Sequence, residues 1–431
     1  FIKTRGQYIE GGYFLHHYYE TSYFESSQPV ILTRYALITP EDMKLTIKTQ
    51  QMPEQPEKRM TELGIMHTWV AQNLPAIKFE TGMPSWEEIG KWVKITTIPS
   101  WKELSTWYGK ITKAKIKSSY EIKEKTAEIL GDKPLTEEQK IKKIYEFITS
   151  QIRYSYVPFR QNGWVPQKAR DVLTTKIGDC KDVATLGIAM LNEAGIEADY
   201  VLVNTGVKAI DIQLPSPVFD HAIATIHTKK GRKYVDLTTN HYSVNSIPSG
   251  DLDVMCLEID TDNSDKLITL HRDNFDKTQT EVFSKVTLDG NNVLTLQQRS
   301  TLTGTMAASY RSTYAEEGYD DIKKMVGEWL GSTYPGVEVD TVWTSDTEQR
   351  DQPFEQNVHF SVPNFISESG SYRMLQIPWV YPIEPDESVS YKDRKYPLEY
   401  YYTSDITREK VEISLPAQIE PLELMTLTQY R

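Results

Sequence analysis

Cysteine is scarce in this chain. The 431 residues include two, Cys180 and Cys256, which cannot build the disulfide framework that stabilises many small secreted domains. The cysteine content therefore does not indicate whether the protein belongs to an oxidising or a reducing compartment. They also make the surroundings of each cysteine informative, because a free cysteine is more often a buried core residue than a reactive one.

An excess of positive charge and long apolar runs are absent as well. The 48 Lys and Arg residues stand against 60 Asp and Glu, for a net charge of −12, whereas a general nucleic-acid binder needs a basic face. We therefore expect no nucleic-acid partner. No stretch approaches the roughly 20 apolar residues that span a bilayer, so we expect no transmembrane segment. The opening FIKTRGQYIE has no charged n-region or apolar h-region, although a processed or truncated chain would start in the same way.

The hydrophobic pattern changes twice along the chain and predicts three domains, which agrees with a length of roughly 150 residues per domain. Residues 1–115 form the first, where runs such as VILTRYALI and KWVKITTI are rich in β-branched and aromatic residues and predict strands. This pattern is present from Phe1, so we expect upstream strands of the same sheet to be missing. Residues 276–431 alternate again around one helix at about 308–331, which predicts a β-sandwich or sheet domain.

Residues 116–275 mix helical and strand periods, which predicts an α+β fold between two β-rich, sandwich-like domains. Helical spacing predicts helices over 119–130, from Thr136 with Gln139 in a capping box, and over about 181–194. Strand propensity predicts strands at 197–204, 221–228 and 233–238.

Cys180 stands in the sequence KIGDCKDVATLGIAML, at the start of the third of these helices. Unpaired backbone N–H groups and the helix dipole favour an anion at that position, and so favour the thiolate that acts as a nucleophile. Lys181 and Asp182 follow it directly. We expect both to be structural, since an acid in a first helical turn is ordinarily a capping residue.

A catalytic cysteine also needs an imidazole, which in turn needs an orienting carboxylate. His221 opens the predicted strand HAIATIHT, and Asp236 lies in the next strand, KYVDLT. If these strands pair through a two-residue loop at Lys229 and Lys230, His221 and Asp236 become diagonal neighbours on one face, whereas an odd loop would separate them. The geometry permits a Cys–His–Asp triad.

Three motifs in this order, GDCKD at 178–182, FDHA at 219–222 and YVDLT at 234–238, resemble the bacterial transglutaminase-like core, which has a papain-like fold. The resemblance covers roughly residues 120–250. It implies that Cys180 is the nucleophile, that His221 is the general base and acid, and that Asp236 is the orienting acid. We expect no cofactor, and no metal site, because His16 and His17 have no companions at metal-ligand spacing.

The flanking segments resemble the same architecture. The stretch TWVAQNLPAIKFETGMPSW is similar to the later part of a β-rich domain of unknown function that precedes such cores in Gram-negative bacteria, and the C-terminal segment is similar to the β domain that often follows them. Proteins built this way usually carry export signals. The resemblance therefore implies a periplasmic or cell-surface location.

Acyl transfer also needs hydrogen-bond donors for the oxyanion. The backbone N–H of Cys180 is the natural first donor. Gln161 and Trp164, in the loop RQNGW, both carry side-chain N–H groups and are candidates for the second donor. Trp164 ranks slightly higher, because an aromatic ring there would also wall the thiolate.

Other residues compete for these roles. We expect Cys256, in DVMCLEI, to be a buried core thiol, and a disulfide between it and Cys180 would count against an enzyme. His227 and His241 are rival imidazoles. Four tryptophans close in sequence would suit a carbohydrate or peptide groove, although packing at a domain interface explains them better: Trp86, Trp92, Trp101 and Trp107.

The motifs together predict a thiol-dependent acyl-transfer enzyme that acts on peptide or side-chain amide bonds through a thioester. The triad is the same for hydrolysis and for transfer to an amine, and it is the resemblance to bacterial proteins of this architecture that favours hydrolysis. It implies a cysteine protease or amidase with a protein or peptide substrate. Two alternatives stay open. In a transglutaminase, an amine rather than water would resolve the thioester. In a periplasmic or surface scaffold, the core would be occluded and the flanking β domains would bind a protein or a glycan.

Overall fold

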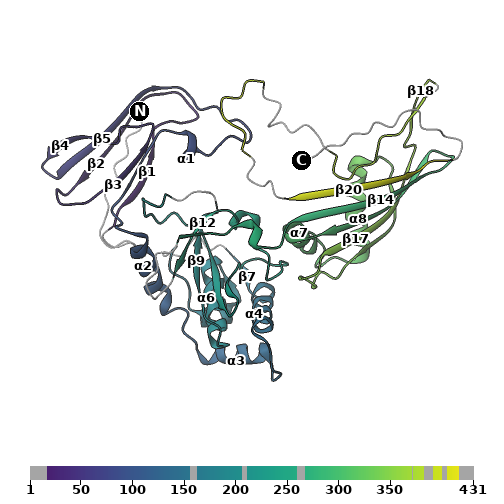
Figure 1. The fold of residues 1–431 in the computed structure, drawn as a ribbon, viewed down its shortest axis with the longest axis horizontal. Helices are drawn as coiled ribbons and strands as arrows, with labels where there is room; N and C mark the ends of the chain where they lie inside the picture. The colour runs from purple at the N-terminus through teal and green to yellow at the C-terminus, as the bar shows by residue number, and fades with distance from the viewer. Residues whose placement is uncertain are drawn as a thin grey trace. The chain divides into compact units, whose positions relative to one another are not determined.

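The computed structural model describes residues 17–155, 163–205, 211–259, 267–370, 372–382, 392–399 and 405–416. The chain forms two compact units. The first contains Phe1–Thr239, Ile247–Asn274 and Pro385–Thr403, and the second contains Asn240–Ser246, Phe275–Glu384 and Ser404–Arg431. The α+β class is confirmed, with β-rich regions before and after a mixed core (Figure 1). The division into three domains stays a prediction.

The N-terminal strands form two three-stranded sheets. One has the order β1 (Tyr19–Tyr23), β6 (Trp92–Thr96), β3 (Thr46–Gln50), and the other has the order β2 (Val30–Thr39), β5 (Gly64–Leu74), β4 (Glu57–Thr61). Their apolar side chains share one core, made of Phe24, Trp69, Leu74, Val93 and Ile95. The strands predicted in this region are therefore confirmed.

Two helices interrupt a region where the sequence predicted strands alone: α1 (Trp86–Ile89) and α2 (Trp101–Lys113). The longer one begins at Ser100, whose hydroxyl accepts a hydrogen bond from the N–H of Glu103. Trp101, Leu104 and Tyr108 then recur at helical spacing and are buried. The aromatic content of this stretch favoured strands, but its periodicity is that of a helix.

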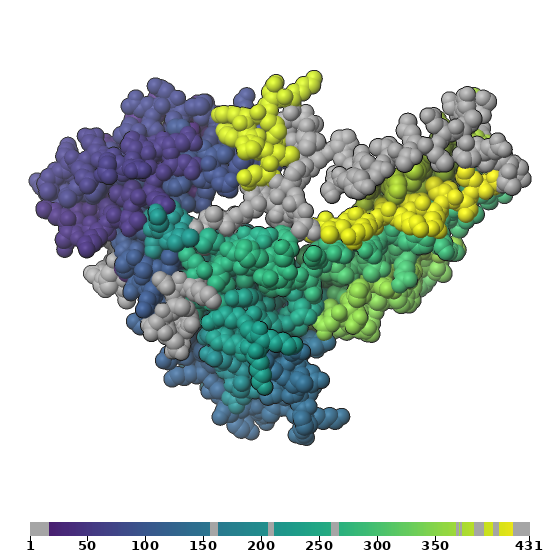
Figure 2. Space-filling model, viewed as in Figure 1, coloured from purple at the N-terminus to yellow at the C-terminus, as the bar shows by residue number. Residues whose placement is uncertain are grey.

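A late segment returns to this N-terminal region. Residues 392–399, yellow in Figure 2, lie against the N-terminal part of the first unit. The carboxylate of Glu80 accepts hydrogen bonds from the N–H groups of Lys395 and Tyr396, at 2.9 and 3.2 Å. The N–H of Glu399 donates to the carbonyl of Gly82 at 2.7 Å. The segments around Glu80 and Lys395 are thus hydrogen-bonded to each other, although about 300 residues separate them in the sequence.

In its described residues, the mixed core has four α-helices and a five-stranded sheet. The helices are α3 (Tyr120–Leu130), α4 (Glu137–Gln151), α5 (Ala169–Thr175) and α6 (Cys180–Glu193). The sheet has the order β11 (Gly231–Val235), β10 (His221–Thr228), β9 (Ala198–Val203), β12 (Met255–Ile259), β13 (Leu267–Thr269). The predicted helix start is confirmed, since Thr136 and Gln139 form a reciprocal capping box.

Helix α6 is the buried axis of this core. Every residue from Lys181 to Leu191 is buried, which is the pattern of a helix covered on all sides. Gly187 lies against the side chains of Leu237 and Ile148. Packing therefore fixes the position of the helix and its rotation about its own axis. Cys180, its first residue, is fixed with it.

The second unit contains a five-stranded sheet in the order β16 (Glu338–Thr344), β17 (Phe354–Pro363), β15 (Val293–Leu302), β14 (Gln279–Leu288), β20 (Ile406–Ser414). A short pair, β18 (Ser367–Ser369) and β19 (Tyr372–Met374), accompanies it. The helix expected over 308–331 is divided into α7 (Gly304–Tyr314) and α8 (Tyr319–Thr333), because Gly318 adopts extended backbone angles and caps the second helix. Val326 and Leu330 of α8 pack in the core of the sheet. Among the described residues, no helix combines the length and apolarity that a membrane crossing requires.

We predict that Gly187→Ala destabilises the protein. A Cβ at this position would lie 2.3 Å from Cδ1 of the buried Leu237 and 3.3 Å from Cδ1 of Ile148. Overpacking of this kind costs about 1–3 kcal/mol. Thermal unfolding measures the loss as a lower Tm.

Gly331→Ala is the matched control for this substitution. Gly331 is also helical, but a Cβ there would meet no atom within 4 Å, so the variant should be neutral or more stable by about 0.5–1 kcal/mol. Equal Tm values for the two variants would contradict the close packing of α6.

Candidate active site

The start of helix α6 is fixed by two aspartates. Asp179 is its N-cap, and its carboxylate accepts a hydrogen bond from the N–H of Asp182, while the carboxylate of Asp182 accepts from the N–H of Asp179, both at 3.3 Å. Cys180 is therefore the first helical residue, with a backbone N–H that the helix itself does not use. Its side chain is partly exposed, whereas both aspartates are buried.

Lys181 and Asp182 have the structural positions that the sequence predicts. Lys181 makes an ion pair with Asp179, and both side chains are largely buried. Asp182 also accepts hydrogen bonds from the backbone N–H of Gln167 at 2.7 Å and from its side-chain amide at 2.8 Å. These contacts tie the segment before α5 to the start of α6.

His221 and Asp236 meet through the predicted hairpin. Strands β10 and β11 pair from Ala224–Val235 to Thr228–Gly231, which leaves the two-residue loop Lys229 and Lys230. His221 and Asp236 are thus diagonal neighbours, and Nε2 of His221 lies 3.2 Å from Oδ2 of Asp236. The other oxygen of Asp236 accepts hydrogen bonds from the N–H and the hydroxyl of Thr238, at 2.8 and 2.7 Å.

The thiol of Cys180 is a hydrogen-bond partner of the same imidazole. Because Nε2 of His221 faces Asp236, Nδ1 is the ring nitrogen left for the thiol. The structure therefore brings Cys180, His221 and Asp236 into one hydrogen-bonded chain.

A second carboxylate, which the sequence did not point to, faces the same nitrogen. Oδ2 of Asp251 lies 3.8 Å from Nε2 of His221, and its side chain is 4 % exposed. Asp251 ends the short 3₁₀ turn η1 (Ser249–Asp251), after Pro248. A single acid in a three-residue turn has no periodicity or motif, so the sequence contained no signal for it.

These groups shift one another's proton affinity. Burial opposes the charged imidazolium, but the hydrogen bonds with Asp236 and Cys180 and the charges of Asp236 and Asp251 outweigh it and raise the pKa of His221 to about 11. Burial also acts to raise the pKa of Asp236, yet its hydrogen bond with His221 and those from Thr238 lower it. Burial and the neighbouring charge of Asp236 raise the pKa of Asp251 to about 8. At neutral pH the site thus holds an imidazolium, one carboxylate and one protonated acid.

The two candidates for the second oxyanion donor have different outcomes. Gln161 lies outside the described residues. The half-buried Trp164 packs edge-on against Trp107 and Tyr108, with ring centroids 5.8 and 6.1 Å apart. Burial raises the pKa of Tyr108, and so do the charges of Tyr200 and Cys180, which places this aromatic cluster near the thiol. A donor role for Trp164 stays a prediction.

The rival residues lie elsewhere. Both cysteines are free, so no disulfide joins them, and Cys256 is fully buried on β12, where burial raises the pKa of its thiol. His227 lies at the far end of β10, where its Nδ1 is 3.3 Å from the carboxylate of Glu197 and its Nε2 is 3.2 Å from the carboxylate of Asp199. His241 belongs to the second unit.

Two groups of described residues bring three potential metal ligands within 4.8 Å of one another: Glu197, Asp199 and His227, and His221, Asp236 and Asp251. In the first group, Arg232 also approaches Nε2 of His227, at 3.1 Å, and its charge opposes a cation. In the second, a metal on Nε2 of His221 would replace the hydrogen bond with Asp236. Neither arrangement favours a metal over the contacts already present.

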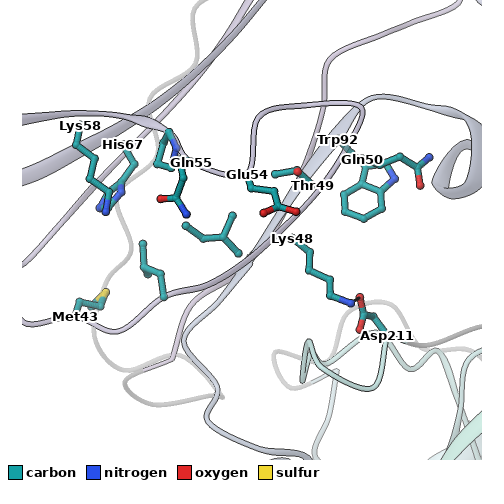
Figure 3. Close-up of a pocket in the computed structure, with 13 residues that line it drawn as sticks. Met43, Lys48, Thr49, Gln50, Glu54, Gln55, Lys58, His67, Trp92 and Asp211 are labelled. Carbon is teal, nitrogen blue, oxygen red and sulfur yellow. Dashed lines mark ion pairs between the residues drawn. The ribbon is translucent and has the colours of Figure 1, made fainter.

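A cavity of about 810 Å³ lies among the N-terminal strands (Figure 3). Lys48 of β3 forms an ion pair with Asp211 at 2.5 Å on one side. His67, on another side, is buried, and its Nε2 lies 3.2 Å from the hydroxyl of Thr39. Its Nδ1 has no hydrogen-bond partner among the residues that the structure describes. Trp92 lines the cavity but is only 9 % exposed, so it offers no open ring face for stacking a sugar.

Residues 124–236 match the family model of the transglutaminase-like superfamily. The matched segment contains Cys180, His221 and Asp236, and it ends before Asp251. No curated protein matches the chain.

Two solved structures are similar to this one. A "putative protease" from Parabacteroides distasonis is 14% identical with a TM-score of 0.52, and the match covers 81% of this chain and 70% of that one. A "putative cysteine protease" from Cytophaga hutchinsonii is 16% identical with a TM-score of 0.25, over 52% of this chain and 75% of that one. At such identity the first likeness concerns the fold alone. By the family-model match, the chain carries a transglutaminase-like domain at residues 124–236, and β-rich regions lie on both sides of it in the sequence.

Proposed function

We propose that this chain is a thiol-dependent acyl-transfer enzyme that cleaves peptide or side-chain amide bonds, as a cysteine protease or amidase. The observation that carries the proposal is the hydrogen-bonded chain from Cys180 through His221 to Asp236 at the start of a buried helix. A papain-like thiol enzyme needs these three groups in this order.

In the first half of the reaction, the Cys180 thiolate attacks the amide carbonyl carbon, and the carbonyl π electrons move to its oxygen. The tetrahedral intermediate collapses when the C–N bond breaks, and His221 gives its proton to the leaving amine. The product is a thioester on Cys180. His221 is then neutral and able to take a proton from the acceptor.

In the second half, water attacks the thioester while His221 removes its proton, and the carboxylic acid leaves with regeneration of the thiolate–imidazolium pair. Asp236 keeps the imidazole in one orientation throughout, because its carboxylate is itself fixed by Thr238. An amine in place of water would give a transglutaminase. Hydrolysis is preferred here because water needs no acceptor site.

The non-catalytic alternative has one observation in its favour. The cavity beside His67 is large enough for a ligand and is formed mainly by the N-terminal strands. It contains a buried imidazole nitrogen that has no partner in the described part of the chain. A binding scaffold would use that surface and leave Cys180 as an ordinary thiol. Thiol reactivity therefore separates the two functions.

We predict that Cys180 reacts with iodoacetamide at a rate that stays nearly constant from about pH 9 down to about pH 6. The imidazolium of His221 persists over this range because its pKa is raised to about 11, and it pairs with the thiolate. In His221→Ala the rate should fall roughly tenfold per pH unit below about 8.5, as for an ordinary thiol. Mass spectrometry of the labelled peptides gives both rates.

Cys256 is the internal control in the same sample, since it is fully buried and should react slowly at every pH. A Cys180 profile that rises only near pH 8.5 in both proteins would overturn the proposed function. In that case, a search for ligands of the N-terminal cavity would follow.

We also predict that Asp251→Asn becomes more stable relative to the unsubstituted protein as pH rises from about 4 to about 8. Unfolded Asp251 loses its proton near pH 4, whereas the folded group keeps it to about pH 8. Because the folded state binds more protons in this window, rising pH costs the unsubstituted protein stability that the amide variant does not lose. Urea unfolding at several pH values measures the difference.

Asp253→Asn is the control with the opposite sign. Burial acts to raise the pKa of Asp253, but hydrogen bonds and the charge of Arg272 outweigh it and lower the pKa. That carboxylate adds stability above about pH 4, which is lost as pH falls through its folded pKa, so its variant should be weakened at neutral pH. Parallel pH profiles for the two variants would contradict a protonated Asp251.

The acceptor is tested separately. With a protein substrate and a labelled primary amine present together, a hydrolase should release new termini or free carboxyl groups and leave the label out. Incorporation of the label that requires Cys180 would assign the transglutaminase reaction instead.

A further inference from the structure

We propose that Tyr154 is a catalytic residue, and that its phenolic hydroxyl is the second donor to the oxyanion, beside the backbone N–H of Cys180. This inference rests on the proposed acyl transfer. It assigns the donor role to a residue outside the loop in which the sequence suggested Gln161 and Trp164.

The need for a second donor follows from the chemistry. Attack by the thiolate moves a full negative charge onto the former carbonyl oxygen, and enzymes meet this charge with preorganised donors, usually more than one. The first turn of α6 offers the N–H of Cys180, which has no partner within the helix. A side-chain donor must reach the same place.

The backbone places Tyr154 next to that N–H. Strand β7 (Arg153–Tyr154) pairs in parallel with β8 (Ile177–Gly178), and Tyr154 is directly opposite Gly178. The N–H of Ser155 donates to the carbonyl of Gly178 at 2.9 Å, which closes the pairing on the far side. The backbone of Tyr154 is thereby held beside Gly178, two residues before Cys180.

The close approach of these strands depends on Gly178. A Cβ at Gly178 would lie 2.6 Å from Cβ of Asp182, the buried residue that completes the cap of α6. The two strands, the cap and the first turn of the helix are therefore one packed unit. Movement of Tyr154 is limited to its side chain.

The hydroxyl of Tyr154 lies within hydrogen-bonding reach of the Cys180 backbone. This hydrogen bond acts to lower the pKa of the phenol, which means that it stabilises the phenolate. A phenolate oxygen accepts hydrogen bonds, so the backbone group that donates is the N–H of Cys180. Burial and the charges of Cys180, Asp179 and Asp236 act the other way and raise the pKa of Tyr154 to about 12. The hydroxyl consequently keeps its proton at neutral pH and remains a donor.

Substrate can reach this group, because the Tyr154 side chain is 47% exposed. In the resting site its oxygen accepts the Cys180 N–H. When a carbonyl oxygen arrives, it takes that N–H and the phenol moves aside to donate its own O–H to the same oxygen. Trp164, in contrast, has its ring packed against two other aromatic side chains.

Tyr154→Phe tests the assignment through two reactions of the same thiol. Alkylation by iodoacetamide displaces iodide from a saturated carbon and forms no oxyanion. Acylation by p-nitrophenyl acetate passes through a tetrahedral oxyanion, as the thiolate attacks the acetyl carbon and p-nitrophenolate leaves. We expect the alkylation rate and its pH profile to stay within about twofold, and the acylation rate to fall by roughly 100-fold.

Two further variants sharpen the result. Tyr120→Phe, at an exposed tyrosine of α3, should change neither rate. Trp164→Phe should leave the ratio of the two rates unchanged. If Trp164→Phe lowers acylation selectively while Tyr154→Phe does not, the donor is Trp164 and the proposal is wrong.

The outcomes separate this inference from the proposed function. Fast, His221-dependent alkylation with unchanged acylation in Tyr154→Phe overturns the inference alone. Equal loss of both reactions in that variant also overturns it, since Tyr154 would then act through the thiolate. A parent protein with an ordinary thiol, or one that alkylates rapidly but does not acylate, overturns both.

Discussion

The cap of helix α6 is the constraint on which the candidate site depends. Asp182 is fully buried and satisfies three partners at once: the N–H of Asp179 and both the backbone and side-chain N–H groups of Gln167. A buried carboxylate is tolerated only when it is paired and hydrogen-bonded in this way. Because the same residue caps α6 and holds the segment before α5, it fixes where the helix begins. Cys180, its backbone N–H and the neighbouring pair β7–β8 all take their positions from that point.

The charge distribution around Cys180 is unusual for a site that we propose to hold a thiolate. Four acids lie at or beside the start of α6 and His221: Asp179, Asp182, Asp236 and Asp251. Lys181, which follows Cys180, is already paired with Asp179. Within the described part of the chain, the positive charge that faces Cys180 is the imidazolium of His221, together with the N-terminal end of α6. The Asp236 carboxylate serves this arrangement, since it stabilises the imidazolium that the proposed thiolate needs.

Much of this arrangement was predictable from sequence because it rests on local rules. The capping box at Thr136, the two-residue hairpin at Lys229 and Lys230, and the diagonal pairing of His221 with Asp236 each follow from residue type and spacing. Helix α2 was missed because its aromatic residues favour strands in isolation. Asp251 and Tyr154 were missed for another reason: each enters the site through a short turn or a two-residue strand, and such elements have too few residues to show a period.

The high proton affinity of His221 raises a question, because an imidazolium that holds its proton this firmly is a poor acid for a leaving amine. The proposed reaction removes one of the charges that stabilise the imidazolium. Part of the stabilisation of the imidazolium comes from Cys180, and in the proposed reaction the attack on the carbonyl converts the thiolate into a neutral thioether sulfur. The negative charge then lies on the oxyanion, where other donors meet it. His221 thus loses one of its stabilising partners as the C–S bond forms, and its proton becomes available at the step that requires it.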